Sequence, residues 1–188
     1  MGFSCFYNRV IYIGAKKGDI HMENDSLLCT DKEFAEIYQR NKDMVYRMCY
    51  LYLKNSADAE DAAQTVFLKW LRSNQMFNEQ EHEKAWFITT AKNHCKDILK
   101  SRWRTHRISF DDLPEVPCWD KDKEPGEVLI KLLSLSEKYK TVLYLFYFEE
   151  YSIKEIAAIL KRKESTIQTQ LSRGRKYLKF DLGGQYNG

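Results

Sequence analysis

All three prolines of the 188-residue chain, Pro114, Pro117 and Pro125, lie within one short stretch. On both sides of it, apolar residues recur at steps of three and four with charged residues between them, which is the period of amphipathic α-helices. Patterns typical of strands are almost absent. Because proline is excluded from helix interiors, the sequence predicts an all-α fold of two small helical domains joined by an acidic, flexible linker. We expect these units at residues 31–105 and 127–180, with the linker at 106–126.

Three helices are expected in the first unit. The first starts at Asp31 and is interrupted at Asn55 and Ser56, and the second begins at Asp58, where an acid in the first turn suits the helix dipole. A polar loop at 74–81 leads to a third helix from about His82. The expected buried residues of the three helices are Phe34, Ile37, Tyr38, Val45, Met48, Cys49 and Tyr52; Ala62, Ala63, Val66, Phe67, Trp70 and Leu71; and Ala85, Trp86, Ile88, Thr89, Ala91, Cys95, Ile98 and Leu99.

The second unit ends in a predicted helix-turn-helix. Two helices separate around 134–136, with Ser136 as a cap, and two more begin at the capping boxes Ser152/Glu155 and Ser165/Gln168. The turn between the last two falls at 160–164. The last helix buries Ile167, Leu171 and Gly174 and exposes amides, hydroxyls and arginines, which suit base edges and phosphates better than a structural surface would. We therefore favour a DNA-binding hairpin over a plain helical core.

Charge is unevenly distributed along the chain. The net charge is only +3, yet the charges are grouped along the chain. Residues 92–107 include six basic residues and one acid, residues 111–127 seven acids and two lysines, and residues 161–179 seven basic residues and one acid. This order favours two polyanion-facing surfaces separated by a segment that avoids polyanions, although any one cluster alone is equally well a solvated helix face.

Metal, disulfide and membrane functions have little support. The five cysteines include no CxxC pair, which argues for a reducing compartment, and no apolar run approaches the ~20 residues of a membrane span. No cofactor motif or catalytic constellation is present, so we expect no enzyme activity and no cofactor. Residues 1–21 lack the helical period and the features of a signal peptide; we expect them to be a non-native extension before a start at Met22.

Two separate motifs resemble bacterial sigma factors. The stretches DAEDAAQTVFLKW (58–70) and KAWFITTAKNHCKDILKSRWRTHR (84–107) are similar to sigma region 2. The stretch LSEKYKTVLYLFYFEEYSIKEIAAILKRKESTIQTQLSRGRKYL (135–178) is similar to region 4. Two regions and a short linker resemble the smallest group of the sigma-70 family, the extracytoplasmic-function (ECF) sigma factors.

The resemblance implies partners and roles. It implies a cytoplasmic protein that binds core RNA polymerase, through the clamp helices of the largest subunit and the flap of the second-largest, and promoter DNA. An anti-sigma factor is a further partner known in the family. The residues implied in clamp binding are Asp61, Gln64, Phe67 and Leu68. Phe67 and Leu68 are also candidates for the core, and we expect at least one of them there.

The minus-ten promoter element is implied to be read by the loop 74–81 and the following helix, which hold a melted strand and one extruded base. The matching residues are Trp86, Asn93, Lys96, Lys100, Arg102, Trp103 and Arg104. Aromatic faces, an amide and cations are the groups that such a strand requires. Trp86 is equally well a core residue, whereas Trp103, between two arginines, is expected to be exposed.

The minus-thirty-five element is implied to be read by the last helix, lying in the major groove. The matching residues are Thr166, Gln168, Thr169, Gln170, Arg173 and Arg175. The chain departs from the family where Gln168 and Gln170 replace basic residues and Lys161 replaces glycine in the turn, so no relative's promoter sequence transfers. The linker is implied to run near nascent RNA, or else is a plain tether.

The alternative function is an operator-binding regulator that never joins core polymerase. The clamp-type motif and the basic third helix argue against it.

Overall fold

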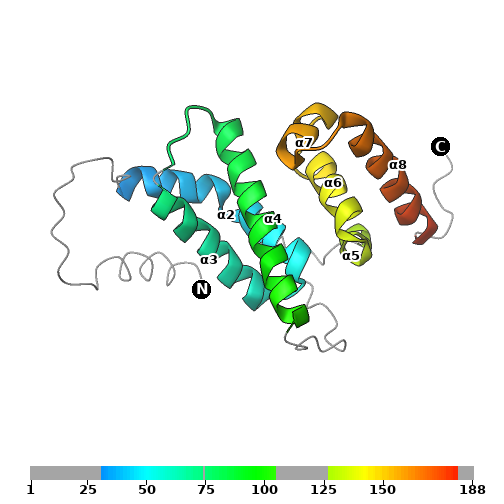
Figure 1. Cartoon of the computed structure of the whole chain (residues 1–188), viewed down its shortest axis with the longest axis horizontal. Coiled ribbons are helices and arrows are strands. Elements are labelled where there is room, and N and C mark those ends of the chain that lie inside the picture. The colour runs from blue at the N-terminus through cyan, green and yellow to red at the C-terminus, as the bar shows by residue number, and fades with distance from the viewer. Residues whose placement is uncertain (1–30, 74, 105–126, 182–188) are drawn as a thin grey trace.

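The computed structural model describes residues 31–73, 75–104 and 127–181, and within these ranges it contains no strand (Figure 1). The first unit comprises α2 (Asp31–Leu53), α3 (Ser56–Ser73) and α4 (Gln80–Arg104). The second comprises α5 (Glu127–Ser134), α6 (Glu137–Tyr147), α7 (Ile153–Leu160) and α8 (Glu164–Asp181). Two interpretations, of residues 1–21 and of the linker at 106–126, lie outside the described residues.

An aromatic cluster holds the first unit together. Phe34 of α2 stacks on Trp70 of α3 with ring centroids 5.8 Å apart, and Phe67 packs 4.8 Å from Tyr38 and 5.1 Å from Phe87 of α4. All five residues are buried. Phe87 was missing from the predicted core, because the predicted face of α4 was placed around Trp86, which is only half-buried. The cluster fixes how all three helices are rotated.

Local polar groups set the boundaries of α2 and α3. Lys54 adopts a left-handed conformation (φ 58°), which ends α2, and its amide donates to the Tyr50 carbonyl. The Asn55 side chain then accepts the amide of Asp58 at 2.9 Å. Because Asn55 supplies the cap, α3 begins at Ser56, two residues before the predicted start.

The capping predictions in the second unit have mixed outcomes. The Ser152/Glu155 capping box is present, with both reciprocal hydrogen bonds. Ser136 occupies the cap of α6 but its side chain makes no capping bond. The Ser165 prediction is wrong, because α8 already begins at Glu164 and Ser165 lies within the helix, where its carbonyl accepts the Thr169 hydroxyl.

A glycine allows α6 and α8 to pack closely. Gly174 is buried, and a Cβ placed there would lie 2.8 Å from Cδ1 of Leu143 on α6. That separation is shorter than carbon atoms tolerate, so a side chain at this position would force the buried Leu143 side chain or α8 itself to shift.

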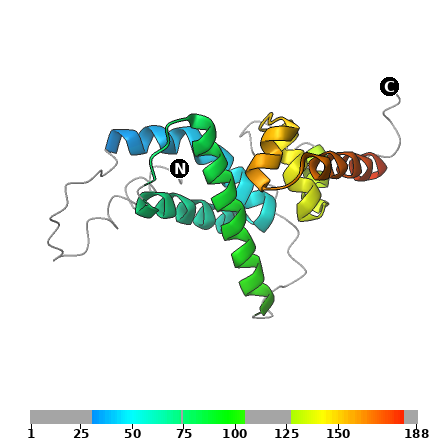
Figure 2. The ribbon, with the colours of Figure 1, turned by 45° about the horizontal axis from the view of Figure 1, so that its top comes forward.

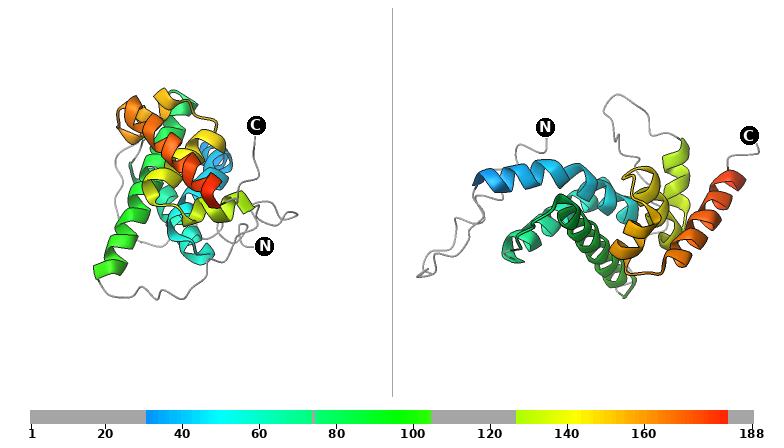
Figure 3. Two further views of the ribbon diagram at one scale, coloured as in Figure 1. Left: turned by 90° about the vertical axis from the view of Figure 1, so that its right-hand side faces the viewer. Right: turned by 90° about the horizontal axis from the view of Figure 1, so that it is seen from above.

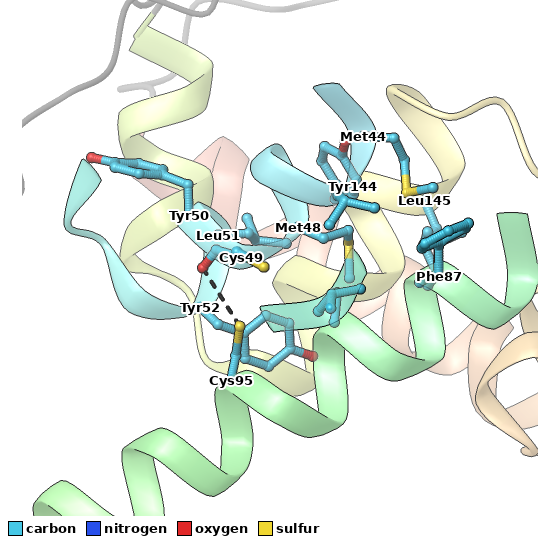
Figure 4. Close-up of a cluster of buried hydrophobic side chains, with 14 of the residues drawn as sticks. Met44, Met48, Cys49, Tyr50, Leu51, Tyr52, Phe87, Cys95, Tyr144 and Leu145 are labelled. Carbon is cyan, nitrogen blue, oxygen red and sulfur yellow. Dashed lines mark hydrogen bonds between the residues drawn. The ribbon is translucent and has the colours of Figure 1, made fainter. Parts of the chain in front are cut away.

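The two units pack directly on one another. Met48 and Tyr52 of α2 belong to the same buried cluster as Tyr144 and Leu145 of α6 (Figure 4). Figures 2 and 3 show the second unit against one side of the first, with α6 and α7 facing it and α8 on the far side. The sequence did not predict this contact, because it joins residues about ninety positions apart.

We predict that Gly174→Ala destabilises the protein by roughly 1–3 kcal/mol, because the methyl group overpacks Leu143. Chemical denaturation measures this change in unfolding free energy. Ser172→Ala, on the exposed side of α8, should stay within about 0.5 kcal/mol of the parent. The cost of Gly174→Ala should shrink in a Leu143→Ala background. An equal cost in both backgrounds would show that this contact is not the cause.

Candidate nucleic-acid interface

The outer face of α3 carries part of the set predicted to contact polymerase. Asp61 is exposed, and Gln64 and Leu68 are half-buried. Positions 61, 64 and 68 lie on one side of a helix with 3.6 residues per turn. Phe67 is 2% exposed, between Tyr38 and Phe87, so it is the member of the Phe67/Leu68 pair that lies in the core, as expected of at least one of them, and it is not part of this surface. Sequence alone did not separate Phe67 from Leu68, because they are adjacent apolar residues.

The loop between α3 and α4 is held at both ends. At its start, the Trp70 indole donates to the Gln75 carbonyl at 3.1 Å. Just after it, the buried carboxylate of Glu83 accepts from Arg40 at 2.9 Å and from Asn41 at 2.5 Å. An ion pair with these extra hydrogen bonds fixes the start of α4 on α2. The described loop residues are therefore presented on a rigid frame.

Aromatic and apolar side chains occur in this loop. Met76 is 57% exposed, and the ring of Phe77 lies 6.0 Å from that of Trp86. Trp86 also packs edge-on against Phe87. Trp86 therefore belongs partly to the core and partly to the loop surface. Met76 and Phe77 belong to the loop 74–81 predicted to read the minus-ten element but were not named among its residues, although an apolar pair within a polar loop was a visible signal.

One stripe of α4 carries most of the residues predicted to bind the melted strand. Asn93, Lys96, Lys100 and Trp103 follow steps of three and four, so they lie along one side of the helix. Trp103 is 73% exposed, as predicted. We call these four residues the α4 stripe.

Two other predicted strand-binding residues fall outside the α4 stripe. Arg102 extends to Asp58 of α3, with its Nη2 atom 2.6 Å from Oδ1, and so ties α4 to α3. The side chain of Arg104 lies outside the described residues.

The middle of the α4 stripe contacts the second unit. Nζ of Lys96 lies 3.4 Å from a Glu137 carboxylate oxygen at the start of α6, and the Thr89 hydroxyl donates to the Ile159 carbonyl of α7 at 3.4 Å. A cavity of about 340 Å³ lies beside these contacts, lined by residues that include Lys92, Lys96 and Arg162. Burial, followed by the charges of Lys96, Arg162 and Lys161, lowers the pKa of Lys92. Positive charge from both units is thus concentrated here.

The rotation of α8 is set by its buried residues Ile167 and Leu171 together with Gly174. At 100° per residue, Thr169 and Lys176 point directly outward, and Ser172 and Arg173 lie about 50° to either side of that direction. The predicted set did not include Ser172 and Lys176. Thr169 is exposed but donates its hydroxyl to the Ser165 carbonyl.

The other predicted residues of α8 divide into two groups. Thr166, Gln168 and Arg173 are exposed on its flanks. Gln170 is half-buried, and its side-chain carbonyl accepts from Arg162 at 2.9 Å. The guanidinium of Arg175 lies over the rings of Phe146 and Tyr147, at 5.4 and 5.6 Å. Gln170 and Arg175 therefore already have partners within the unit.

The turn before α8 needs an unusual backbone conformation. Lys161 has a φ of 52°, and its amide caps α7 through the carbonyls of Ala157 and Ala158. Glycine adopts this conformation without strain, so the backbone at Lys161 has a geometry that suits glycine better than lysine.

Both units match known protein families. Residues 37–105 match the family described as Sigma-70 region 2, and residues 128–178 match Sigma-70, region 4. The ECF RNA polymerase sigma factor SigW of Bacillus subtilis (strain 168) is 28% identical over 166 residues, covering 79% of this chain and 88% of SigW. SigM of the same organism is 29% identical over 153 residues, covering 77% and 91%.

Solved structures share the fold. The sigma factor RpoE in complex with the anti-sigma factor NepR, from Bartonella quintana, has a TM-score of 0.70 at 19% identity and covers 82% of this chain and 99% of that one. CnrH in complex with the cytosolic domain of CnrY has a TM-score of 0.59 at 16% identity, with coverage of 96% and 99%.

Region 2 followed by region 4 defines a promoter-specificity subunit of bacterial RNA polymerase. The chain belongs to the sigma-70 family and, within it, to the ECF sigma factors. Its function is to direct core RNA polymerase to promoters, and the operator-binding alternative is not favoured. None of the described helices combines the length and apolarity needed to cross a membrane.

Proposed function

We propose that three surfaces divide the work of promoter recognition: the outer face of α3 binds the polymerase clamp, the α4 stripe with the preceding loop holds the melted minus-ten strand, and α8 reads the minus-thirty-five element. One observation carries the assignment. Each surface presents exposed polar or aromatic side chains on a helix whose other side is fixed in the core.

The α3 surface suits a basic helical partner. Asp61 provides an exposed negative charge, and Leu68 a partly exposed apolar group about two turns further along. A helix with this combination can lie against a coiled coil through apolar contact and charge complementarity. Phe67 supports the surface from beneath, in the core.

The α4 surface suits a single strand. Trp103 offers an exposed stacking face, Asn93 an exposed amide, and Lys100 a cation for phosphates. Positions 86 and 103 lie roughly 25 Å apart along a helix that rises 1.5 Å per residue. Trp86, together with Phe77 of the preceding loop, therefore lies at one end of a surface long enough for several nucleotides.

The α8 surface suits the major groove. Its outward hydroxyls and lysine contact DNA first, with Gln168 on one flank to read a base edge and Arg173 on the other to bind phosphate. Arg175 stabilises the aromatic surface of α6, where Tyr147 and Phe148 are 53% and 43% exposed. This apolar surface is the contact for the polymerase flap.

Further partners follow from the family. The proposal includes a cytoplasmic location, a non-enzymatic role as a polymerase subunit, and control by an anti-sigma factor, the partner class named for RpoE. The experiment that tests the function is transcription by core polymerase, with and without the purified protein, from the promoter of its own operon. Tight DNA binding without any association with core polymerase would overturn it.

We expect Asp61→Lys to weaken binding to core polymerase, because it reverses the charge that faces the clamp. The dissociation constant is measured by fluorescence anisotropy. Glu60→Lys is the matched control, since it makes the same charge change at an adjacent exposed position on another side of α3. If both variants bind equally well, the clamp contact lies elsewhere.

We expect Gln168→Ala and Arg173→Ala to differ in kind. Loss of a base contact should reduce discrimination at one base pair by roughly 1–3 kcal/mol. Loss of a phosphate contact should weaken binding to all sequences and lower the salt slope by about one. Both effects are measured from the affinity of each variant for minus-thirty-five DNA duplexes that differ at one base pair, determined at two salt concentrations. Exchanged phenotypes would mean that α8 is rotated differently in the groove.

We expect Asn93→Ala and Trp103→Ala to bind duplex promoter but fail to open it. Stacking on an aromatic residue contributes roughly 1–3 kcal/mol per base, which offsets the cost of unstacking. Permanganate reactivity of thymines reports opening. Trp103→Phe should retain part of the activity, and a promoter already opened by mismatches should rescue the alanine variants. Normal opening by Trp103→Ala would make α4 a purely structural helix.

A further inference from the structure

A lysine is buried between the two units. Lys140 of α6 is 3% exposed, and its Nζ atom donates to the Leu51 carbonyl, in the last turn of α2, at 2.5 Å. It also lies 5.5 Å from the centre of the Tyr52 ring. A residue of region 4 therefore caps the C-terminus of a region 2 helix, where a cation meets the negative end of the helix dipole.

The ammonium group is poorly compensated. Among the described residues, no carboxylate lies within ion-pair distance of its Nζ, and the nearby Glu137 is already 3.4 Å from Lys96. The other groups that act on it are Lys54 at the end of α2, which opposes its charge, and Cys95 of α4. Burial, the largest effect, lowers the pKa of Lys140 from 10.5 to about 8. Packing the units together is therefore unfavourable to this charge.

Other polar groups in the same interface are unsatisfied. Within the described ranges, Nε of Arg47 and the hydroxyl of Tyr151 are buried without a hydrogen bond. Arg47 lies on α2 and contacts Glu149, two residues past the end of α6, with 3.6 Å between Nη2 and Oε1. Buried groups of this kind weaken an interface. The shared apolar cluster and the 2.7 Å hydrogen bond between Tyr52 and Thr141 stabilise the same interface.

The packed arrangement does not fit simultaneous reading of both promoter elements. α7 contacts α4 and α8, so about two helix spacings, roughly 20 Å, separate the reading helices. The two elements are named for positions about 25 base pairs apart, or roughly 85 Å of duplex at 3.4 Å per pair. The packed form also places Glu137 against Lys96 of the α4 stripe. The units must separate before they can act.

We propose that the buried charge of Lys140 limits how tightly the two units pack, and so keeps the packed form weak enough for core polymerase and promoter DNA to open it. This inference rests on the proposed function for the need to open, but the packing itself is measured without polymerase or DNA. The lysine orients the two units through the α2 cap and simultaneously limits how tightly they associate.

The inference has a pH signature. The pKa of Lys140 is lower in the packed form than in the open form, so between about pH 8 and 10.5 the packed form binds fewer protons. Raising the pH through this range therefore favours packing. Below about pH 8 the lysine is charged in both forms and the full penalty applies. The two pKa values give an increase in the packing constant of about tenfold between pH 7 and 9.

The test is energy transfer between dyes attached at two exposed positions, Glu60 in α3 and Lys176 in α8, in the full chain. We expect Lys140→Met to be more closed than the parent at pH 7 and to lose most of the pH response. Lys138→Met, an exposed lysine on the same helix, is the matched control and should keep the parent's response. Lys92, which also lies at the interface, is present in all three proteins.

Two results would overturn the inference. One is an unchanged pH response in Lys140→Met, and the other is a more open variant at pH 7. If Lys140→Met fails to fold, Tyr52→Phe replaces it: loss of the hydrogen bond to Thr141 should lower energy transfer while leaving the pH response intact. A flat pH response in both the parent and Tyr52→Phe would then overturn the inference.

Binding of core polymerase tests whether the strength of packing matters for function. The more closed Lys140→Met should bind severalfold more weakly than the parent at pH 7, and Tyr52→Phe at least as tightly as the parent. A shift in packing with no change in polymerase affinity would show that the strength of packing set by Lys140 does not control polymerase binding, and would overturn that part of the inference. If no variant, nor the parent, binds polymerase, the proposed function fails, while energy transfer still decides the role of Lys140.

Discussion

The position of α4 constrains the rest of the molecule, because this helix is packed along two of its sides. Phe87, Ile88, Ala91 and Cys95 are buried against α2 and α3. A helix is a rigid rod, so burying these residues fixes the direction of every other side chain on it. The α4 stripe consequently faces away from the region 2 core and toward α6 and α7. The surface proposed for the melted strand therefore overlaps the contact with region 4 at Lys96, where the side chain lies 3.4 Å from Glu137.

That overlap links the stability of the fold to its function. The two units share an apolar cluster, yet their interface also contains the charged Lys140 and the unsatisfied groups of Arg47 and Tyr151. An interface optimised only for stability would replace a buried ammonium with an apolar side chain. A protein whose units must part to reach two DNA elements requires an interface that is specific in geometry and limited in strength. The hydrogen bond from Lys140 to Leu51 provides both properties.

Periodicity predicted most of the helices, because apolar spacing reports which side of a helix is buried without knowledge of what covers it. The capping box of Ser152 was readable for the same reason: its bonds join residues three apart. Errors arose where a distant or neighbouring group intervened. The side chain of Asn55 caps α3, so this helix starts earlier than predicted. Phe87, and not Trp86, lies at the centre of the core, because it packs against Phe67 and Trp70 of α3.

The sequence by itself determined the helical class, the two-unit organisation, the family and the residue types available for polymerase and DNA, since these depend on local patterns and motifs. Only the tertiary structure decided which of those residues are accessible. In the folded protein Phe67 lies in the core, and Arg102 forms an ion pair with Asp58. Arg175 lies over the rings of Phe146 and Tyr147, and Glu137 of region 4 contacts Lys96 of the α4 stripe. These outcomes depend on contacts between residues far apart in the chain, whose geometry exists only once the helices have packed.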